Sequence, residues 1–239
     1  MSESFLSVEN LKTYYLQKNN IVKAVDGVSF KIKEGEFFAL TGPSGCGKTT
    51  LGLSILKLIQ PPAKIISGKI EFNGIDLLSV SDKELQKIRG SAISMVFQDP
   101  FTSLNPVMSI YEQLIEGPIY HFGLDEAEAL TIVKKALKKV KISDVDVVLR
   151  QYPHQLSGGQ RQRIMIAMAL SCGAKFIIAD EPTTALDVST QKQIVELLLD
   201  LKRTDKISLL FISHNLRLAE KLCDKIALMS NGKIVQRLK

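Results

Sequence analysis

The sequence has few cysteines, and those it has form no pattern. Only three of the 239 residues are cysteine, at positions 46, 172 and 223, and no Cys-x-x-Cys pair occurs. The three histidines, at 121, 154 and 214, are equally scattered. These absences argue against a disulfide framework and against a zinc or histidine-rich metal cluster. We therefore expect a protein of the reducing cytosol.

Long hydrophobic runs are also lacking. The most apolar stretch, Ile164 to Ala179, is interrupted by Lys175 and is shorter than the roughly 20 residues of a membrane helix. The opening "MSESFLSVEN" has no basic start followed by an apolar core. We expect neither a signal peptide nor a membrane span.

No strong charge of one sign is present. The net charge is +6, and much of the excess lies in "VKKALKKVK", residues 133–141. Such a run is usually the solvated face of a helix, and no RNA- or DNA-binding motif accompanies it. We expect no nucleic-acid partner.

The order of the segments predicts an α/β fold. Residues up to about 76 read as strands and turns, with turn signals at Asn19-Asn20 and Asn73-Gly74. Residues 103–156 read as helices, with an apolar stripe at Leu130, Val133, Leu137 and Val140. Short apolar strands such as "KFIIAD" and "ISLLFISH" then alternate with helices, which is typical of a mostly parallel sheet. The helical segment is interpreted as an insert.

"GPSGCGKT", residues 42–49, fits the phosphate-loop pattern G-x-x-x-x-G-K-[ST] between a predicted strand and a predicted helix. Glycines let the backbone turn its N–H groups toward phosphate oxygens, and the helix N-terminus adds a positive dipole. Lys48 is expected to reach the terminal phosphates, and the Thr49 hydroxyl to ligate Mg²⁺. The predicted ATP-binding residues of this loop are Gly42, Pro43, Ser44, Gly45, Cys46, Gly47, Lys48, Thr49 and Thr50.

Two carboxylates follow the apolar run "FIIA" in "FIIADE", residues 176–181. Parallel sheets bind ligands at the carboxyl ends of their strands. Asp180 is predicted to hold Mg²⁺ through water, and Glu181 to polarise the attacking water as a general base. Taken alone the pattern is equally typical of a surface strand end. Its pairing with a phosphate loop favours the functional interpretation.

"LSGGQRQR", residues 156–163, contains a serine N-cap followed by two glycines, which cost a helix roughly 1 kcal/mol each relative to alanine. A second exposed helix N-terminus is a second anion site. One nucleotide cannot easily use both sites of one chain, because they are far apart in the sequence. A head-to-tail dimer resolves this, if the segment Ser157–Gln160 of each copy closes over the γ-phosphate held by the other.

These motifs, in this order and over nearly the whole chain, resemble the ATP-binding cassette of ABC transporters. The resemblance implies a P-loop NTPase (RecA-like) core, an N-terminal antiparallel β subdomain and an inserted α-helical subdomain. It places the core with the β subdomain at residues 1–98 and 157–239, and the helical subdomain at 99–156, in one nucleotide-binding domain. It also assigns further roles to several residues. Tyr15 is expected to stack on adenine, with Tyr14 as the alternative. Gln98 is expected to contact Mg²⁺ and the attacking water, and His214 is expected to contact the γ-phosphate. The expected signature consists of Leu156, Ser157, Gly158, Gly159 and Gln160, and the expected D-loop consists of Thr184, Ala185, Leu186 and Asp187.

"FQDPFTSLNP", residues 97–106, resembles the corresponding segment of the oligopeptide, dipeptide and nickel importer ATPases. The resemblance implies a hinge and part of the groove that receives a coupling helix of a membrane subunit. "PPAKIISGKIEFNGIDLLS" is similar to the first of the two different ATPase subunits that such systems carry. The expected partners are a second, different ATPase, two permease subunits and, indirectly, a solute-binding protein, at the cytoplasmic face of the membrane. ATP and Mg²⁺ are the expected cofactors.

Two other functions stay open at this point. One is a soluble ABC-type switch acting on nucleic acid or the ribosome, although such proteins usually carry two cassettes in one chain or a long coiled-coil insert. The other is the ATPase of an exporter, which the residues after Gln98 argue against.

Overall fold

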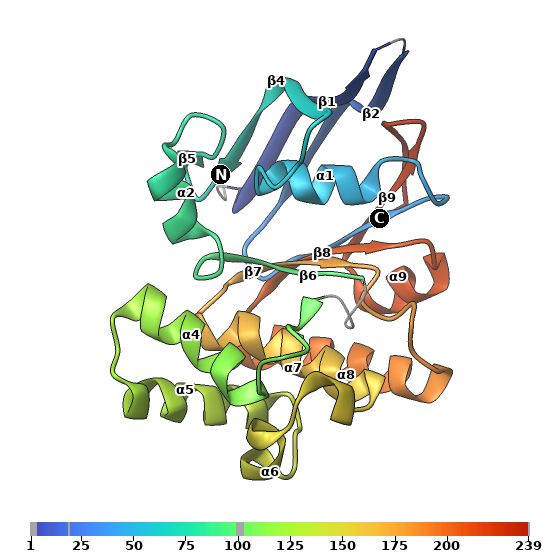
Figure 1. Cartoon of the computed structure of the whole chain (residues 1–239). Helices are drawn as coiled ribbons and strands as arrows, with labels where there is room; N and C mark the ends of the chain where they lie inside the picture. The colour runs from blue at the N-terminus through green and yellow to red at the C-terminus, as the bar shows by residue number, and fades with distance from the viewer. Residues whose placement is uncertain (1–3, 19, 99–102, 239) are drawn as a thin grey trace. The chain divides into compact units, whose positions relative to one another are not determined.

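The computed structural model describes residues 4–18, 20–98 and 103–238 (Figure 1). The chain divides into two compact units, Met1–Gln86 with Ile207–Lys239, and Lys87–Lys206. Each unit contains α-helices and β-strands.

The first unit contains the predicted N-terminal antiparallel sheet. Its strands lie in the order β2-β1-β4-β5, and every neighbouring pair is antiparallel. Their bounds are β1 Leu6–Gln17, β2 Asn20–Ile32, β4 Ala63–Phe72 and β5 Ile75–Asp76. The predicted turn at Asn73-Gly74 joins β4 to β5, with both φ angles positive, at 48° and 80°. Asn19 of the other predicted turn lies outside the described residues.

The first unit also contains parallel strands around the fully buried β3 (Phe37–Thr41). β8 (Ser208–Ser213) and β9 (Lys225–Ser230) run parallel to β3, and β10 (Lys233–Arg237) is antiparallel to β9. Its helices are α1 (Lys48–Ile55), α2 (Asp82–Ile88) and α9 (Leu216–Leu222). Figure 1 shows α1 lying over the antiparallel sheet, where it contacts β1 and β2.

The helical composition after the phosphate loop continues to Pro61-Pro62, but the helix itself is shorter. α1 ends at Ile55, and Lys57 adopts a left-handed φ of 50°. The backbone N–H groups of Lys57 and Leu58 bond back to Ser54 and Leu53 at 3.1 and 2.8 Å. The last turn is therefore closed locally, although no proline or glycine marks it.

The second unit consists of helices and a parallel strand pair, β6 (Ile93–Val96) and β7 (Phe176–Asp180). Helix α7 packs against α4, α5, α8 and β6. The helical bounds are α4 Ile110–Phe122, α5 Glu126–Lys139, α6 Val145–Arg150, 3₁₀ helix η1 Pro153–Gln155, α7 Gly158–Ser171 and α8 Val188–Asp205. The apolar stripe predicted for α5 is confirmed, since Val133, Leu137 and Val140 are buried and Leu130 is half-buried.

Among the residues that the structure describes, no helix is both long enough and apolar enough to cross a bilayer.

Candidate functional site

The phosphate loop, residues 42–49, leaves the carboxyl end of β3 and runs directly into α1. Two of its positions accept only glycine. A Cβ on Gly47, where φ is +106°, would lie 1.8 Å from the carbonyl oxygen of Ala24. A Cβ on Gly42 would lie 2.1 Å from the carbonyl oxygen of Met229. The loop is therefore held between β2 and the end of β9, as close backbone approach requires.

Lys48 is almost fully buried, with 5% of its surface exposed. Its Nζ donates hydrogen bonds to the carbonyl oxygens of Gly42 and Pro43, both at 2.9 Å. The ammonium group is thus kept at the start of the loop, and Thr49 beside it is exposed in the first turn of α1. The loop therefore presents a cation and a hydroxyl together with the N-terminus of a helix.

The two candidate tyrosines differ in what they contact. The Tyr15 hydroxyl lies 3.3 Å from Oγ1 of Thr50, in the first turn of α1. The Tyr14 hydroxyl instead donates to a carboxylate oxygen of Asp26 at 2.7 Å. This bond raises the pKa of Tyr14 and lowers the pKa of Asp26. Of the two, Tyr15 is the one that contacts the helix after the loop.

A hairpin near the C-terminus supports the phosphate loop, and the sequence reading missed it. The N–H of Gly232 donates to the carbonyl oxygen of Cys46 at 3.0 Å. Asn231 and Gly232 form the β9–β10 turn with φ angles of 46° and 78°. An Asn-Gly pair between strands predicts such a turn. Nothing local predicts that the turn contacts a loop almost 190 residues earlier in the chain.

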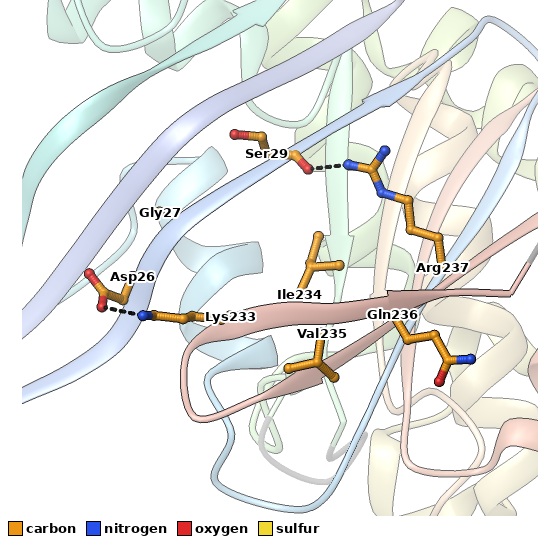
Figure 2. A pocket seen from close by; sticks show the side chains of 8 residues that line it. All are labelled: Asp26, Gly27, Ser29, Lys233, Ile234, Val235, Gln236 and Arg237. Atoms are coloured by element: carbon orange, nitrogen blue, oxygen red, sulfur yellow. Dashed lines mark hydrogen bonds and ion pairs between the residues drawn. The ribbon is translucent and has the colours of Figure 1, made fainter.

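A groove of about 560 Å³ runs between β2 and β10 in the first unit (Figure 2). It is crossed by two polar contacts, the ion pair of Lys233 with Asp26 at 3.5 Å and the bond from Arg237 Nη2 to the Ser29 carbonyl at 3.0 Å. No residue predicted to bind nucleotide lines this groove. Its size alone does not identify it as the functional site.

His214 lies at the same edge as the phosphate loop. The parallel register of β3 and β8 pairs Thr41 with Ser213, and Gly42 and His214 are the next residues. The His214 side chain is exposed. The sheet therefore places this histidine beside the start of the phosphate loop.

The second unit repeats this arrangement with carboxylates and an amide. The register of β6 and β7 pairs Val96 with Ala179, so Gln98 and Asp180 emerge at one edge of the strand pair. Gln98 is exposed, and Asp180 is only 3% exposed. Glu181 follows, half-buried, with a left-handed φ of 46°. A non-glycine residue in this region is uncommon, and such backbone geometry is found at functional sites.

The predicted D-loop, residues 184–187, leads into α8 and is closed by hydrogen bonds. Asp187 is the N-cap and accepts bonds from the backbone and hydroxyl groups of Ser189 and Thr190, at 2.6 to 3.0 Å. These bonds hold the pKa of Asp187 far below its usual range. Thr184 Oγ1 donates to Glu181 Oε2 at 2.9 Å. The sequence did not predict this last contact.

The signature residues form the N-terminus of α7 as predicted. Ser157 is the N-cap in a capping box: its Oγ accepts the N–H of Gln160 at 3.2 Å, and Gln160 Oε1 accepts the N–H of Ser157 at 2.9 Å. Leu156 is buried beneath this turn, whereas Ser157 is exposed. This is a helix N-terminus open to solvent, as an anion site requires.

The two signature glycines contact the D-loop segment of the same chain. A Cβ on Gly158 would lie 3.3 Å from Leu186 Cδ2, and one on Gly159 only 2.6 Å from Thr190 Cγ2. Close packing of α7 on the start of α8 therefore explains glycines that cost helix stability. Sequence reasoning explained them only as an anion site.

Part of the predicted hinge, residues 97–106, lies outside the described residues, namely 99–102. The segment that follows is fixed by the buried side chain of Gln113. Gln113 Nε2 donates to the carbonyl oxygens of Asn105 and Met108 at 3.0 and 2.9 Å, and its Oε1 accepts the N–H of Asn105 at 2.8 Å. Val107, 79% exposed, is the most solvent-accessible apolar residue of this segment.

The predicted magnesium ligands have the chemistry that this ion prefers. Thr49, Gln98 and Asp180 offer hydroxyl, amide and carboxylate oxygens. Within residues 4–18, 20–98 and 103–238, no three His, Cys, Asp or Glu side chains cluster as a metal site. In phosphate-transfer enzymes Mg²⁺ keeps several waters and is bound mainly through substrate phosphates.

Two features define a P-loop NTPase here. A phosphate loop follows one buried parallel strand, and an Asp-Glu pair lies at the end of another such strand. The family model described as ABC transporter matches residues 25–184 of this chain. The chain belongs to the ABC transporter family, and it is an ATP-binding and ATP-hydrolysing cassette.

Individual relatives are similar along almost the whole chain. The oligopeptide transport ATP-binding protein AppD of Bacillus subtilis (strain 168) is 46% identical over 98% of this chain and 71% of its own length. The dipeptide transport ATP-binding protein DppD of Escherichia coli (strain K12) is 41% identical over 98% of this chain and 71% of its own. Among solved structures, the dimeric post-hydrolysis state of the ATP-binding cassette MJ0796 bound to ADP and Pi matches with a TM-score of 0.86. It shows 30% identity and covers 98% of both chains. The fold predicted from the sequence is confirmed.

Proposed function

We propose that this chain is the ATPase subunit of an importer for peptides, acting through separate permease subunits at the cytoplasmic face of a membrane. The observation that carries this proposal is the near-full-length similarity to the oligopeptide and dipeptide transport ATP-binding proteins. The sequence resemblance left peptides and nickel open, and the names of these relatives favour peptides. A second ATPase subunit, different from this chain, and a solute-binding protein complete the proposed system.

We assign nucleotide binding to the phosphate loop and Tyr15 of the first unit, and catalysis to His214 of the first unit together with Gln98 and Glu181 of the second. The loop 42–50 with Lys48 binds the phosphates, Tyr15 stacks on adenine, and His214 contacts the γ-phosphate. Thr49, Gln98 and Asp180 hold Mg²⁺, which when bound offsets the charge of the phosphates. Glu181 orients and deprotonates the attacking water.

The signature serves the nucleotide of a partner cassette. Exposed Ser157 and the N–H groups of α7 bind the γ-phosphate held by the partner's loop, and the D-loop lies at the junction. ATP thereby closes the dimer and hydrolysis opens it. The helical insert of residues 99–156 transmits this movement to the permease through the segment around Val107. An interface of this kind needs only a few kcal/mol of differential binding to switch.

The experiment is peptide uptake into proteoliposomes that contain the assembled transporter and internal ATP. Glu181→Gln should reduce both ATPase turnover and uptake by about 100-fold or more, while ATP still binds. Turnover near the wild-type rate would refute the assignment of Glu181 as the base. Wild-type turnover without uptake of any peptide would refute the proposed substrate class.

A further inference from the structure

Thr184 and Glu181 form a closed turn in the second unit. The Thr184 hydroxyl donates to Glu181 Oε2 at 2.9 Å, and the Thr184 N–H donates to the Glu181 carbonyl at 3.2 Å. Both the main chain and the carboxylate of Glu181 are therefore bonded to one residue. Hydrogen bonds at exposed positions are individually weak, but two from one residue define an orientation.

The left-handed backbone of Glu181 is unfavourable by itself, so the orientation of this residue depends on neighbouring contacts. Its φ of 46° lies in the left-handed region, which costs an ordinary L-residue about 1 kcal/mol or more. Such a conformation persists only where neighbouring contacts hold it. The turn closed by Thr184 supplies two of those contacts.

The far end of the same segment is anchored. Asp187 caps α8 through bonds to Ser189 and Thr190, and Leu186 N–H bonds to the Thr183 carbonyl at 3.2 Å. Thr183 is buried and its hydroxyl accepts a bond from Gln191 at 3.1 Å. Thr184 therefore connects an anchored loop to the Glu181 carboxylate, and it is itself exposed.

We propose that Thr184 is a positioning residue for Glu181, whose hydroxyl fixes the direction of the carboxylate and ties it to the D-loop. The inference rests on the proposed role of Glu181 as the base. Thr184 touches no reacting atom in this scheme. It acts by holding the acceptor oxygen Oε2 and thereby fixing the orientation of the carboxylate that takes the proton from water.

The test compares Thr184→Val, which keeps the shape but removes the hydroxyl, with Thr184→Ser, which keeps the hydroxyl. In the assembled transporter, Thr184→Val should lower kcat about tenfold while the KM for ATP stays within about twofold, since binding is not altered. Thr184→Ser should restore kcat to within about threefold of the wild type. Thr204→Val is the matched control, because Thr204 donates a similar bond to Asp205 at 2.7 Å at the distant end of α8.

Two further measurements separate this role from others. Adding Thr184→Val to Glu181→Gln should lower the residual rate no further, because the oriented group is already lost. ATP-driven association of Glu181→Gln cassettes should be unchanged by Thr184→Val. A loss of association would instead assign Thr184 to the dimer contact and overturn the proposal.

The failures of the two proposals can be told apart. If Glu181→Gln abolishes turnover and Thr184→Val leaves kcat within twofold of the wild type, the positioning role is wrong and the base assignment stands. If Glu181→Gln retains turnover, the base assignment is wrong, and the proposed role of Thr184 is then wrong too.

Discussion

Thr41 and Ser213 are register partners at the carboxyl ends of two neighbouring parallel strands, so the phosphate loop and His214 begin at the same edge of the sheet. Ligands of parallel α/β sheets bind at this edge. The relationship gives His214 a location suited to contact with a bound phosphate, which the motif order alone could only suggest.

Replacing His214 should therefore affect hydrolysis more than binding. His214→Ala is expected to lower kcat by about 100-fold, because a group that contacts the transferred phosphoryl acts mainly in the transition state. ATP affinity, measured by fluorescent nucleotide titration, should change by less than about fivefold. His154→Ala, at an exposed histidine stacked on Tyr152, is the control. Equal losses in both variants would contradict the assignment.

Gly47 should be far less tolerant of alanine than a glycine with similar backbone geometry and open space. Gly47→Ala places a Cβ 1.8 Å from the Ala24 carbonyl, which forces β2 and the phosphate loop apart. Gly35 has φ +71° and nothing within 4 Å, so Gly35→Ala should cost only about 1 kcal/mol of stability. We expect Gly47→Ala to lose ATP binding by calorimetry. Retained affinity would mean that the loop does not depend on this close approach.

Local patterns predicted the parts of the site that depend on local chemistry. The phosphate loop was predictable because glycine spacing, a lysine and the flanking strand and helix lie within about 20 residues. The cap of α7 was predictable because Ser157 and Gln160 have the spacing of a capping box. The contacts of Gly159 with Thr190 and of Cys46 with Gly232 were not predictable, since they join residues 31 and 186 positions apart. The early end of α1 had no local signal either.

The serine of the signature should have a functional effect beyond its capping role. Ser157→Ala removes one cap and should cost about 1 kcal/mol of stability. Ser109 caps α4 with the same capping box, formed with Glu112, so Ser109→Ala should cost about as much. Thermal unfolding should show similar shifts for both, but only Ser157→Ala should reduce ATPase activity and ATP-driven dimerisation. Equal losses of activity in Ser157→Ala and Ser109→Ala would show that Ser157 acts only as a structural cap.

The packing of α7 on α8 predicts that a second substitution restores the stability lost by a first one. Gly159→Ala directs a Cβ to within 2.6 Å of Thr190 Cγ2, and overpacking of this kind costs about 1–3 kcal/mol. Thr190→Ser removes that methyl group and keeps the hydroxyl that bonds to Asp187. The double variant should therefore regain most of the stability lost by Gly159→Ala, with a coupling energy of about 1 kcal/mol or more in denaturant titrations. Simple additivity of the two effects would show that the helices adjust without this contact.

The cap of α8 predicts a pH dependence of stability. The pKa of Asp187 is lowered in the folded chain by its bonds to Ser189 and Thr190, so its charged form is favoured by folding. A lowered folded-state pKa adds stability above the unfolded value of about 3.9, and that stability is lost as the pH falls below it. Asp187→Asn keeps one side-chain oxygen for the backbone cap, and it removes the charge together with the oxygen that accepts the Thr190 hydroxyl. The difference in Tm between the wild type and Asp187→Asn should be constant from about pH 8 to pH 5 and shrink below about pH 4. A difference that persists unchanged into strong acid would show that the carboxylate charge does not stabilise the D-loop.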